Sequence, residues 1–179
     1  MKKFFKGFTL IELLIVIALL GALAVGLLAA LDPFEQLKKG NDTGIRNTVS
    51  ELQQSMIRYY AIKNSMPWED LATPVSTFPP TQLSSAAYTN PVNVPAIIAT
   101  GELKTDFSTL AGGQLSSITI MGGTQSVTVC FEPASKSFRS DPNTKYYISG
   151  STITSYTANN INTCGDPTSS SFGCMWCVQ

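Results

Sequence analysis

Few side chains in this 179-residue sequence are suited to catalysis, and histidine is absent altogether. Without histidine the chain lacks the commonest general base and the commonest metal ligand. The acidic residues Glu69, Asp70 and Asp141 lie in loop-like sequence, and no glycine-rich phosphate loop follows a strand-like run. We therefore expect a protein that is not an enzyme and that has no catalytic residues, no cofactor and no metal site.

The reactive side chains that remain are four cysteines, at positions Cys130, Cys164, Cys174 and Cys177. Four cysteines allow two disulfides in three connectivities. On an extended segment the Cα atoms of Cys174 and Cys177 would lie roughly 10 Å apart, so each would pair with Cys130 or Cys164; a tight turn would reverse that. The Cys-x-x-Cys spacing also fits a redox motif, but no βαβ pattern surrounds it, so we favour structural disulfides.

A single carboxylate interrupts the long apolar run from Phe8 to Leu31, at Glu12. A helix of this length reaches roughly 36 Å, enough to cross a hydrocarbon core of roughly 30 Å. Lys2, Lys3 and Lys6 precede the run and orient it with the N-terminus in the cytoplasm. A glutamate inside such a helix costs a few kcal/mol, and it usually marks a function with an identifiable partner.

Glu12 requires a cation, and no lysine or arginine occurs between Lys6 and Lys38. Cleavage between Gly7 and Phe8 would create an ammonium group one helical turn away, able to pair with its own Glu12 or with that of a neighbouring helix. Two alternatives are a secretory signal peptide cut after Ala24 and a plain uncleaved anchor. Neither of them gives Glu12 a role.

Residues 6–13 read KGFTLIEL and resemble the processing site of type IV prepilins and of type II secretion pseudopilins. The resemblance implies that a prepilin peptidase cleaves after Gly7 and N-methylates Phe8, and that Glu12 acts in assembly. It implies further partners: other pilin or pseudopilin subunits, an inner-membrane assembly platform and the lipid bilayer. It also implies a single-pass inner-membrane protein with an extracytoplasmic C-terminal domain, which becomes a cell-surface or periplasmic filament after assembly.

Four segments follow along the chain: a leader at 1–7, a transmembrane and assembly helix at 8–31, an amphipathic helical continuation at 32–63, and an exported, loop-rich sheet domain at 64–179. Asp32 as N-cap, Pro33 at the first helical position and Glu35 three residues after the cap mark the start of the second helix. Residues 40–44 weaken helicity. One apolar stripe then recurs at steps of four and three: Ile45, Val49, Leu52, Met56 and Tyr59.

The exported segment predicts an antiparallel sheet. From Ser65 to Ser116 we expect a proline-rich loop without long regular structure. Within it we expect a short strand or helical turn between Asn90 and Leu103, with Ile97 and Ile98 as buried contacts. Two hairpins follow, with strands at 117–121 and 126–131 and at 145–149 and 152–156, and a last strand lies near 175–178. The fold class is therefore α+β: a long N-terminal helix packed on a roughly four-stranded antiparallel sheet, the layout that the resemblance also implies.

The formal charge is zero, from 12 basic and 12 acidic side chains, which does not support nucleic-acid binding. We expect a structural subunit of a type IV pilus-like or type II secretion pseudopilus filament, assembled through its N-terminal hydrophobic helix. The alternative is a membrane-anchored extracytoplasmic binding domain with an uncleaved N-terminal anchor.

Overall fold

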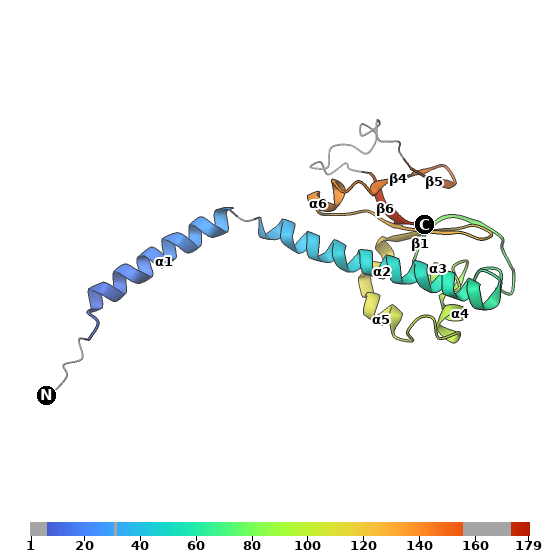
Figure 1. Cartoon of the computed structure of the whole chain (residues 1–179), viewed down its shortest axis with the longest axis horizontal. Helices are drawn as coiled ribbons and strands as arrows, with labels where there is room; N and C mark the ends of the chain where they lie inside the picture. The colour runs from blue at the N-terminus through green and yellow to red at the C-terminus, as the bar shows by residue number, and fades with distance from the viewer. Residues whose placement is uncertain (1–6, 31, 156–172) are drawn as a thin grey trace. The chain divides into compact units, whose positions relative to one another are not determined.

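The computed structural model describes residues 7–30, 32–155 and 173–179. The chain divides into two compact units, Met1–Leu37 and Lys38–Gln179, which are described separately below. Figure 1 shows the elements of both along the chain.

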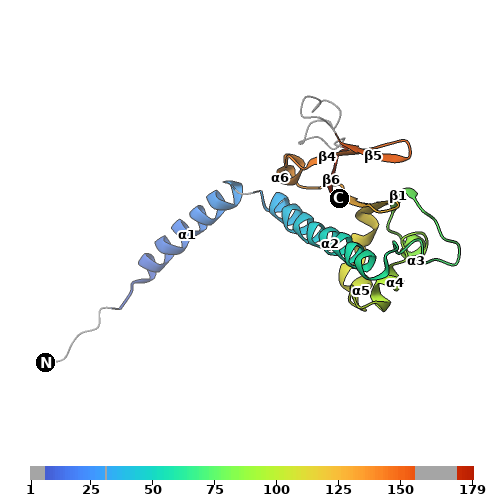
Figure 2. The same ribbon diagram turned by 45° about the vertical axis from the view of Figure 1, so that its right-hand side comes forward.

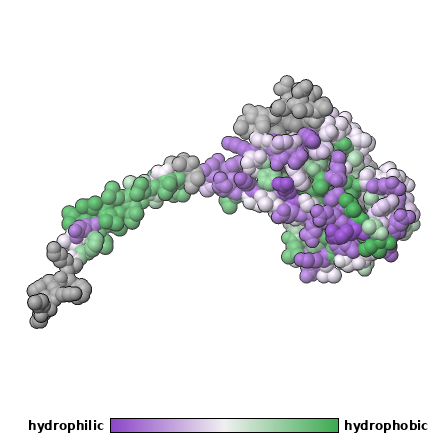
Figure 3. All heavy atoms as spheres, viewed as in Figure 1, coloured by the Kyte–Doolittle hydropathy of each residue, from purple (hydrophilic) through white to green (hydrophobic). Residues whose placement is uncertain are grey.

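The first unit contains helix α1 (Leu10–Ala30). Its apolar residues form a helix but no hydrophobic core. Every leucine, isoleucine and valine from Leu10 to Leu28 is between 46% and 82% exposed. Figure 3 shows this surface as almost uniformly hydrophobic, with a hydrophilic patch near the start of the helix. Within the described residues, the stretch Leu10–Leu28 is long and apolar enough to cross a membrane.

Helix α2 (Pro33–Lys63) begins where the sequence predicts, because Asp32 Oδ1 accepts a hydrogen bond from the Glu35 N–H at 3.3 Å. The expected weakening at residues 40–44 is wrong, since α2 runs through them unbroken. Within this stretch the Thr43 hydroxyl donates to the Lys39 carbonyl at 2.8 Å, and a Cβ atom added to Gly44 would lie 3.2 Å from Gln114 Nε2.

The predicted apolar stripe of α2 is buried, with Ile45, Val49, Leu52, Met56 and Tyr59 all at most 4% exposed. Within the described residues, the stripe packs on one face of a six-stranded antiparallel sheet in the order β1-β2-β3-β6-β4-β5. The strands are β1 (Phe78–Gln82), β2 (Ile118–Gly122), β3 (Val127–Phe131), β4 (Thr144–Ser149), β5 (Thr152–Ser155) and β6 (Met175–Val178).

Both predicted hairpins are present, as β2–β3 and β4–β5, and the last strand is β6. The expected count of roughly four strands is too low. Strand β1 was missed because Pro79 and Pro80 interrupt its pattern, but at a sheet edge the missing N–H groups are tolerated. Strand β6 lies between β3 and β4, so the last strand of the chain joins the two hairpins into one sheet.

The helical turn allowed for between Asn90 and Leu103 is present, but the rest of the segment from Ser65 to Ser116 is more ordered than the predicted loop. The whole segment contains β1 and short helices α3 (Ser85–Thr89), α4 (Val94–Ala99), α5 (Phe107–Ala111) and η1 (Gly112–Ser117). Figures 1 and 2 show α3, α4 and α5 near α2, away from the β4–β5 hairpin. Ile97 is fully buried, as expected, and Ile98 is partly buried against the same core.

A second, smaller core cluster contains Cys130, Ile153, Met175 and Cys177. It is separate from the main cluster, to which the β3 residues Val127, Val129 and Phe131 belong. Because successive side chains of a strand point to opposite faces, β3 is buried on both sides. The Ile153 N–H contacts Met121 Sδ at 3.4 Å, which places β5 against β2 at this second cluster.

Candidate functional site

The segment around Gly7, Phe8 and Glu12 forms a defined local structure at the start of α1. The Thr9 N–H and the Thr9 hydroxyl both donate to Glu12 Oε2, at 2.9 and 2.7 Å. In return the Glu12 N–H donates to Thr9 Oγ1 at 3.3 Å. This reciprocal arrangement is a capping box, in which Thr9 is the N-cap and Glu12 is the third helical residue.

The capping box was missed in the sequence, although its Thr-x-x-Glu pattern is visible at the start of the apolar run. It uses only one oxygen of the Glu12 carboxylate. Among the described residues no donor contacts the other oxygen, Oε1. The carboxylate therefore has a local partner in the uncut chain and still has an oxygen available for a further donor.

Gly7 and Phe8 precede the helix and are both exposed, with Phe8 78% exposed. A Cβ atom added to Gly7 would meet nothing within 4 Å, and its φ lies outside the left-handed region. The fold of the chain itself therefore does not require glycine at this position. Any requirement for glycine would have to come from a partner that binds the segment.

The described cysteines all belong to the other unit, Lys38–Gln179. Cys130 and Cys177 face each other across β3 and β6 and form a disulfide, with their Cα atoms 4.1 Å apart. Cys174 is also disulfide-bonded, and Cys164 lies outside the described residues. Cys177 is thus bonded to Cys130 and not to Cys174, which differs from the pairing that a Cys-x-x-Cys redox site requires.

The acidic residues of the loops accept hydrogen bonds from groups close to them and do not form a common site. Asp70 accepts from the Tyr59 hydroxyl at 2.5 Å and from the Ser65 hydroxyl at 3.0 Å. Burial of the Tyr59 ring, reinforced by this hydrogen bond and by the charge of Asp70, raises the pKa of Tyr59 above its ordinary value. Glu69 accepts from the Met66 N–H, and Asp141 from the Asn143 N–H, both at 2.8 Å.

A buried carboxylate that the sequence did not reveal is Asp42 on α2, which is 0% exposed. Its Oδ1 accepts from the Ala134 N–H at 3.1 Å, and its Oδ2 accepts from the N–H and hydroxyl of Ser135 at 2.7 and 2.6 Å. Asp42 precedes Ile45 by three residues and so continues the apolar stripe. Its position on the buried face of the helix could have indicated that it is buried. Through these hydrogen bonds Asp42 connects α2 to the turn after β3.

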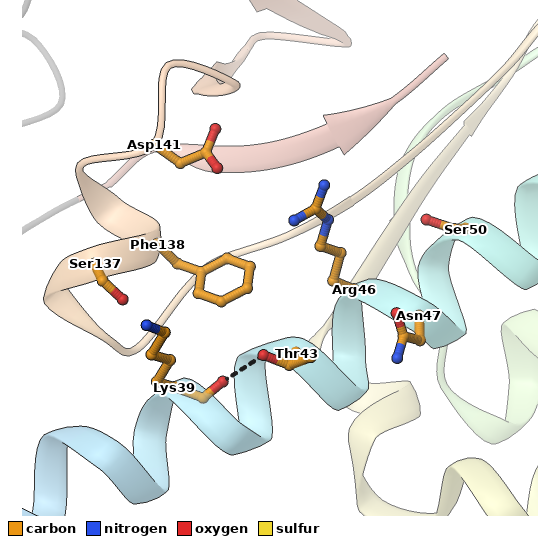
Figure 4. A pocket seen from close by; sticks show the side chains of 8 residues that line it. All are labelled: Lys39, Thr43, Arg46, Asn47, Ser50, Ser137, Phe138 and Asp141. Atoms are coloured by element: carbon orange, nitrogen blue, oxygen red, sulfur yellow. Dashed lines mark hydrogen bonds between the residues drawn. The ribbon is translucent and has the colours of Figure 1, made fainter.

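A polar groove of about 620 Å³ lies between α2 and the short helix α6 (Lys136–Arg139). Figure 4 shows the α2 side chains of Lys39 and Arg46 facing Phe138 and Asp141 across it. The Arg46 guanidinium also lies 4.9 Å from the centre of the Trp176 ring, a cation–π contact that orients it. The lining residues are Lys39, Thr43, Arg46, Asn47, Ser50, Ser137, Phe138 and Asp141.

The groove provides two cationic groups and several hydroxyls, an arrangement that could bind a polar partner but that contains no nucleophile with an adjacent base. Within the part of the chain that the structure describes, no group of three or more His, Cys, Asp or Glu side chains could hold a metal ion.

Comparison with known proteins gives one match. A family model described as the prokaryotic N-terminal methylation motif matches residues 2–28. No curated protein and no solved structure matches the chain. Residues 2–28 therefore carry the class III signal peptide of type IV pilins and pseudopilins, and together with the apolar helix α1 they suit a protein anchored in the inner membrane.

Proposed function

We propose that this protein is the precursor of a filament subunit of a type IV pilus or a type II secretion pseudopilus. A prepilin peptidase cleaves it after Gly7 and methylates the new N-terminus at Phe8. The observation that carries the proposal is the methylation motif at residues 2–28, whose Gly7–Phe8 bond lies in exposed chain immediately before an apolar helix.

The surface of α1 supports assembly through this helix. Apolar surface left in water costs roughly 25 cal/mol per Å², so the large aliphatic side chains of α1 need either lipid or other helices around them. A precursor in the membrane has lipid as its neighbour. In a filament, the same surface packs against the α1 helices of other subunits.

Glu12 sets the register between neighbouring helices in this proposal. Its Oε1 atom has no donor among the described residues, whereas Oε2 is held by Thr9. A carboxylate enclosed among apolar helices is tolerable only opposite a cation. The Phe8 ammonium of an adjacent subunit supplies that cation, so pairing selects one axial offset between subunits.

The remaining assignments follow from the same proposal. In the precursor, the N-terminus lies in the cytoplasm and the unit Lys38–Gln179 lies on the outer side of the cytoplasmic membrane. After assembly, the same unit is part of a cell-surface or periplasmic filament. The partners are the prepilin peptidase, the assembly platform of the inner membrane and other subunits of the filament. The role is structural and not enzymatic, and it needs no cofactor.

A second candidate is a membrane-anchored binding domain whose helix is only a tether. The polar groove between α2 and α6 favours it, because Lys39 and Arg46 present positive charge there. The two candidates differ in how α1 responds to substitution. A tether tolerates any apolar replacement along the helix, whereas packing between subunits does not.

Intact-mass and N-terminal mass spectrometry tests the proposal on protein recovered from membranes of a host that contains a prepilin peptidase. We expect a mature chain that begins at Phe8 and carries one added methyl group. The control is Gly7→Val, which should stay uncut although the structure gives its side chain room. A wild-type chain that begins after Ala24, or that remains uncut at Met1, would contradict the proposal.

A further inference from the structure

The capping box determines where α1 begins. The first hydrogen bond of the helical type runs from the Leu13 N–H to the Thr9 carbonyl at 3.2 Å, and α1 starts at Leu10. Thr9 is therefore the N-cap, and Phe8 and Gly7 lie before it. The Gly7–Phe8 peptide bond therefore lies immediately before the N-cap residue.

Thr9 actively prevents the helix from extending backwards. In a longer helix the Glu12 N–H would donate to the Phe8 carbonyl, four residues earlier. Here the Glu12 N–H donates to the Thr9 hydroxyl at 3.3 Å, and the Thr9 N–H is occupied by the Glu12 carboxylate at 2.9 Å. Two of the four N–H donors that a further helical turn would need are thus already used.

The position of the helix start affects how accessible the Gly7–Phe8 bond is to the peptidase. Hydrolysis adds one water across the Gly7–Phe8 amide: the Gly7 carbonyl carbon gains the hydroxyl oxygen and the Phe8 nitrogen gains a proton. The attacked carbonyl must be reachable, and a carbonyl inside a helix is engaged by the N–H four residues later. With the helix stopped at Leu10, no helical N–H engages the Gly7 carbonyl in the described structure.

We propose that Thr9, through its capping box with Glu12, is a positioning residue for processing: it stops the membrane helix at Leu10 and leaves the Gly7–Phe8 bond in non-helical chain for the peptidase. This inference rests on the proposed function. It gives Glu12 a role before cleavage, which is separate from the pairing with an ammonium group after cleavage.

The test is the rate at which full-length precursor is converted to the chain beginning at Phe8, followed by pulse-labelling in membranes that contain prepilin peptidase. Thr9→Val removes the hydroxyl and keeps the shape of the side chain. We expect it to slow conversion roughly fivefold, the factor that corresponds to loss of an N-cap worth about 1 kcal/mol. Thr9→Ser keeps the hydroxyl and should stay within about twofold of wild type.

Two further variants separate the helix stop from other roles of the same groups. Glu12→Gln keeps an oxygen that accepts from the Thr9 N–H, so it should be cut at about the wild-type rate although the charge is gone. Adding Leu10→Pro to Thr9→Val restores a helix stop without a hydroxyl, because proline suits the first helical position and disfavours helical backbone before it. This double variant should regain most of the lost rate.

The outcomes distinguish this inference from the proposed function. If the wild type is not cut at Phe8 at all, the proposed function fails. If the wild type is cut and Thr9→Val, recovered from the membrane in equal amount, is cut equally fast, the capping-box inference fails while the proposed function stands. If Leu10→Pro does not rescue Thr9→Val, the peptidase recognises the hydroxyl itself, and the helix-stop account is overturned.

Discussion

Glu12 in the first unit and Asp42 in the second are both carboxylates that accept from a hydroxyl and from at least one backbone N–H, but they differ in how many of their oxygens are bound. Both oxygens of Asp42 accept hydrogen bonds, and the residue is fully buried. Only one oxygen of Glu12 does so, on an exposed helix. The difference separates a contact that completes a fold from one that is still open to a partner.

The same contrast holds for the apolar surfaces of the two units. The large side chains of α1 are exposed, whereas the α2 stripe is buried against the sheet. Unit Lys38–Gln179 has its own core and a disulfide, and α1 has neither. The second unit is therefore complete as a fold, while the first depends on lipid or on other helices.

Removing residues 1–31 should produce the largest effect. A chain that begins at Asp32 keeps the N-cap of α2 and all of the buried core. We expect it to be monomeric and soluble without detergent and to unfold cooperatively, whereas the full chain needs detergent or lipid. Sedimentation and thermal unfolding of the two chains measure this difference. A truncated chain that aggregates or lacks a cooperative transition would contradict the claim that the second unit is self-sufficient.

The Cys130–Cys177 disulfide should provide the next largest effect. It joins residues 47 positions apart, and closing a loop of that size stabilises a fold by about 4 kcal/mol in the chain-entropy account. The double variant Cys130→Ala/Cys177→Ala should lose about that much unfolding free energy in urea. Cleavage at Phe8 should be unchanged, because the bond lies in the other unit. A loss below about 1 kcal/mol would show that β6 is held by packing alone.

Asp42→Ala tests the buried carboxylate of α2, and Asp32→Ala tests the exposed carboxylate that caps the same helix. Asp42→Ala removes the acceptor of three donors, two of which belong to the buried Ser135, so we expect a loss of about 3 kcal/mol of unfolding free energy. The control is Asp32→Ala, which removes an exposed N-cap worth about 1 kcal/mol. Equal losses for both variants, measured by urea unfolding in detergent, would remove the distinction between the two aspartates.

The smallest expected effect concerns Tyr59, whose hydroxyl donates to Asp70 at 2.5 Å. Tyr59→Phe should cost about 1 kcal/mol of unfolding free energy at neutral pH. The pKa of Tyr59 is raised in the folded state, so its contribution is present below the unfolded value of about 10 and is lost as the pH rises above it. The stability difference between wild type and variant should therefore shrink above pH 10. A difference that grows with pH would contradict the assigned hydrogen bond.

Patterns with a strict period predicted the fold well. The α2 stripe, the Asp32 cap and the two hairpins around Gly122 and Gly150 each follow from local residue types, and the structure contains all of them. Strand β1 and the short helices α3, α5 and η1 do not follow from local residue types, because they are too short for a period and are stabilised by tertiary contacts. Helix α4 lies where a short strand or helical turn was expected.

The candidate site could be predicted in part. The positions of Gly7, Phe8 and Glu12 stand out because a carboxylate is costly in an apolar run. The capping bonds could also be predicted from the Thr9-x-x-Glu12 pattern, but the missing cation is the more prominent feature of this apolar run. Asp42 was hidden for a different reason, since its donors at Ala134 and Ser135 lie more than ninety residues away.

The central claim is that the open oxygen of Glu12 is completed by another subunit, and Glu12→Gln tests it most directly. The measurement is the share of processed chain found in sheared filaments relative to the membrane, for wild type and variant in the same host. We predict that the variant is cut at Phe8 like the wild type but that its share in filaments falls at least tenfold, because a buried ammonium loses its charged partner. A variant that enters filaments as well as the wild type would contradict the account.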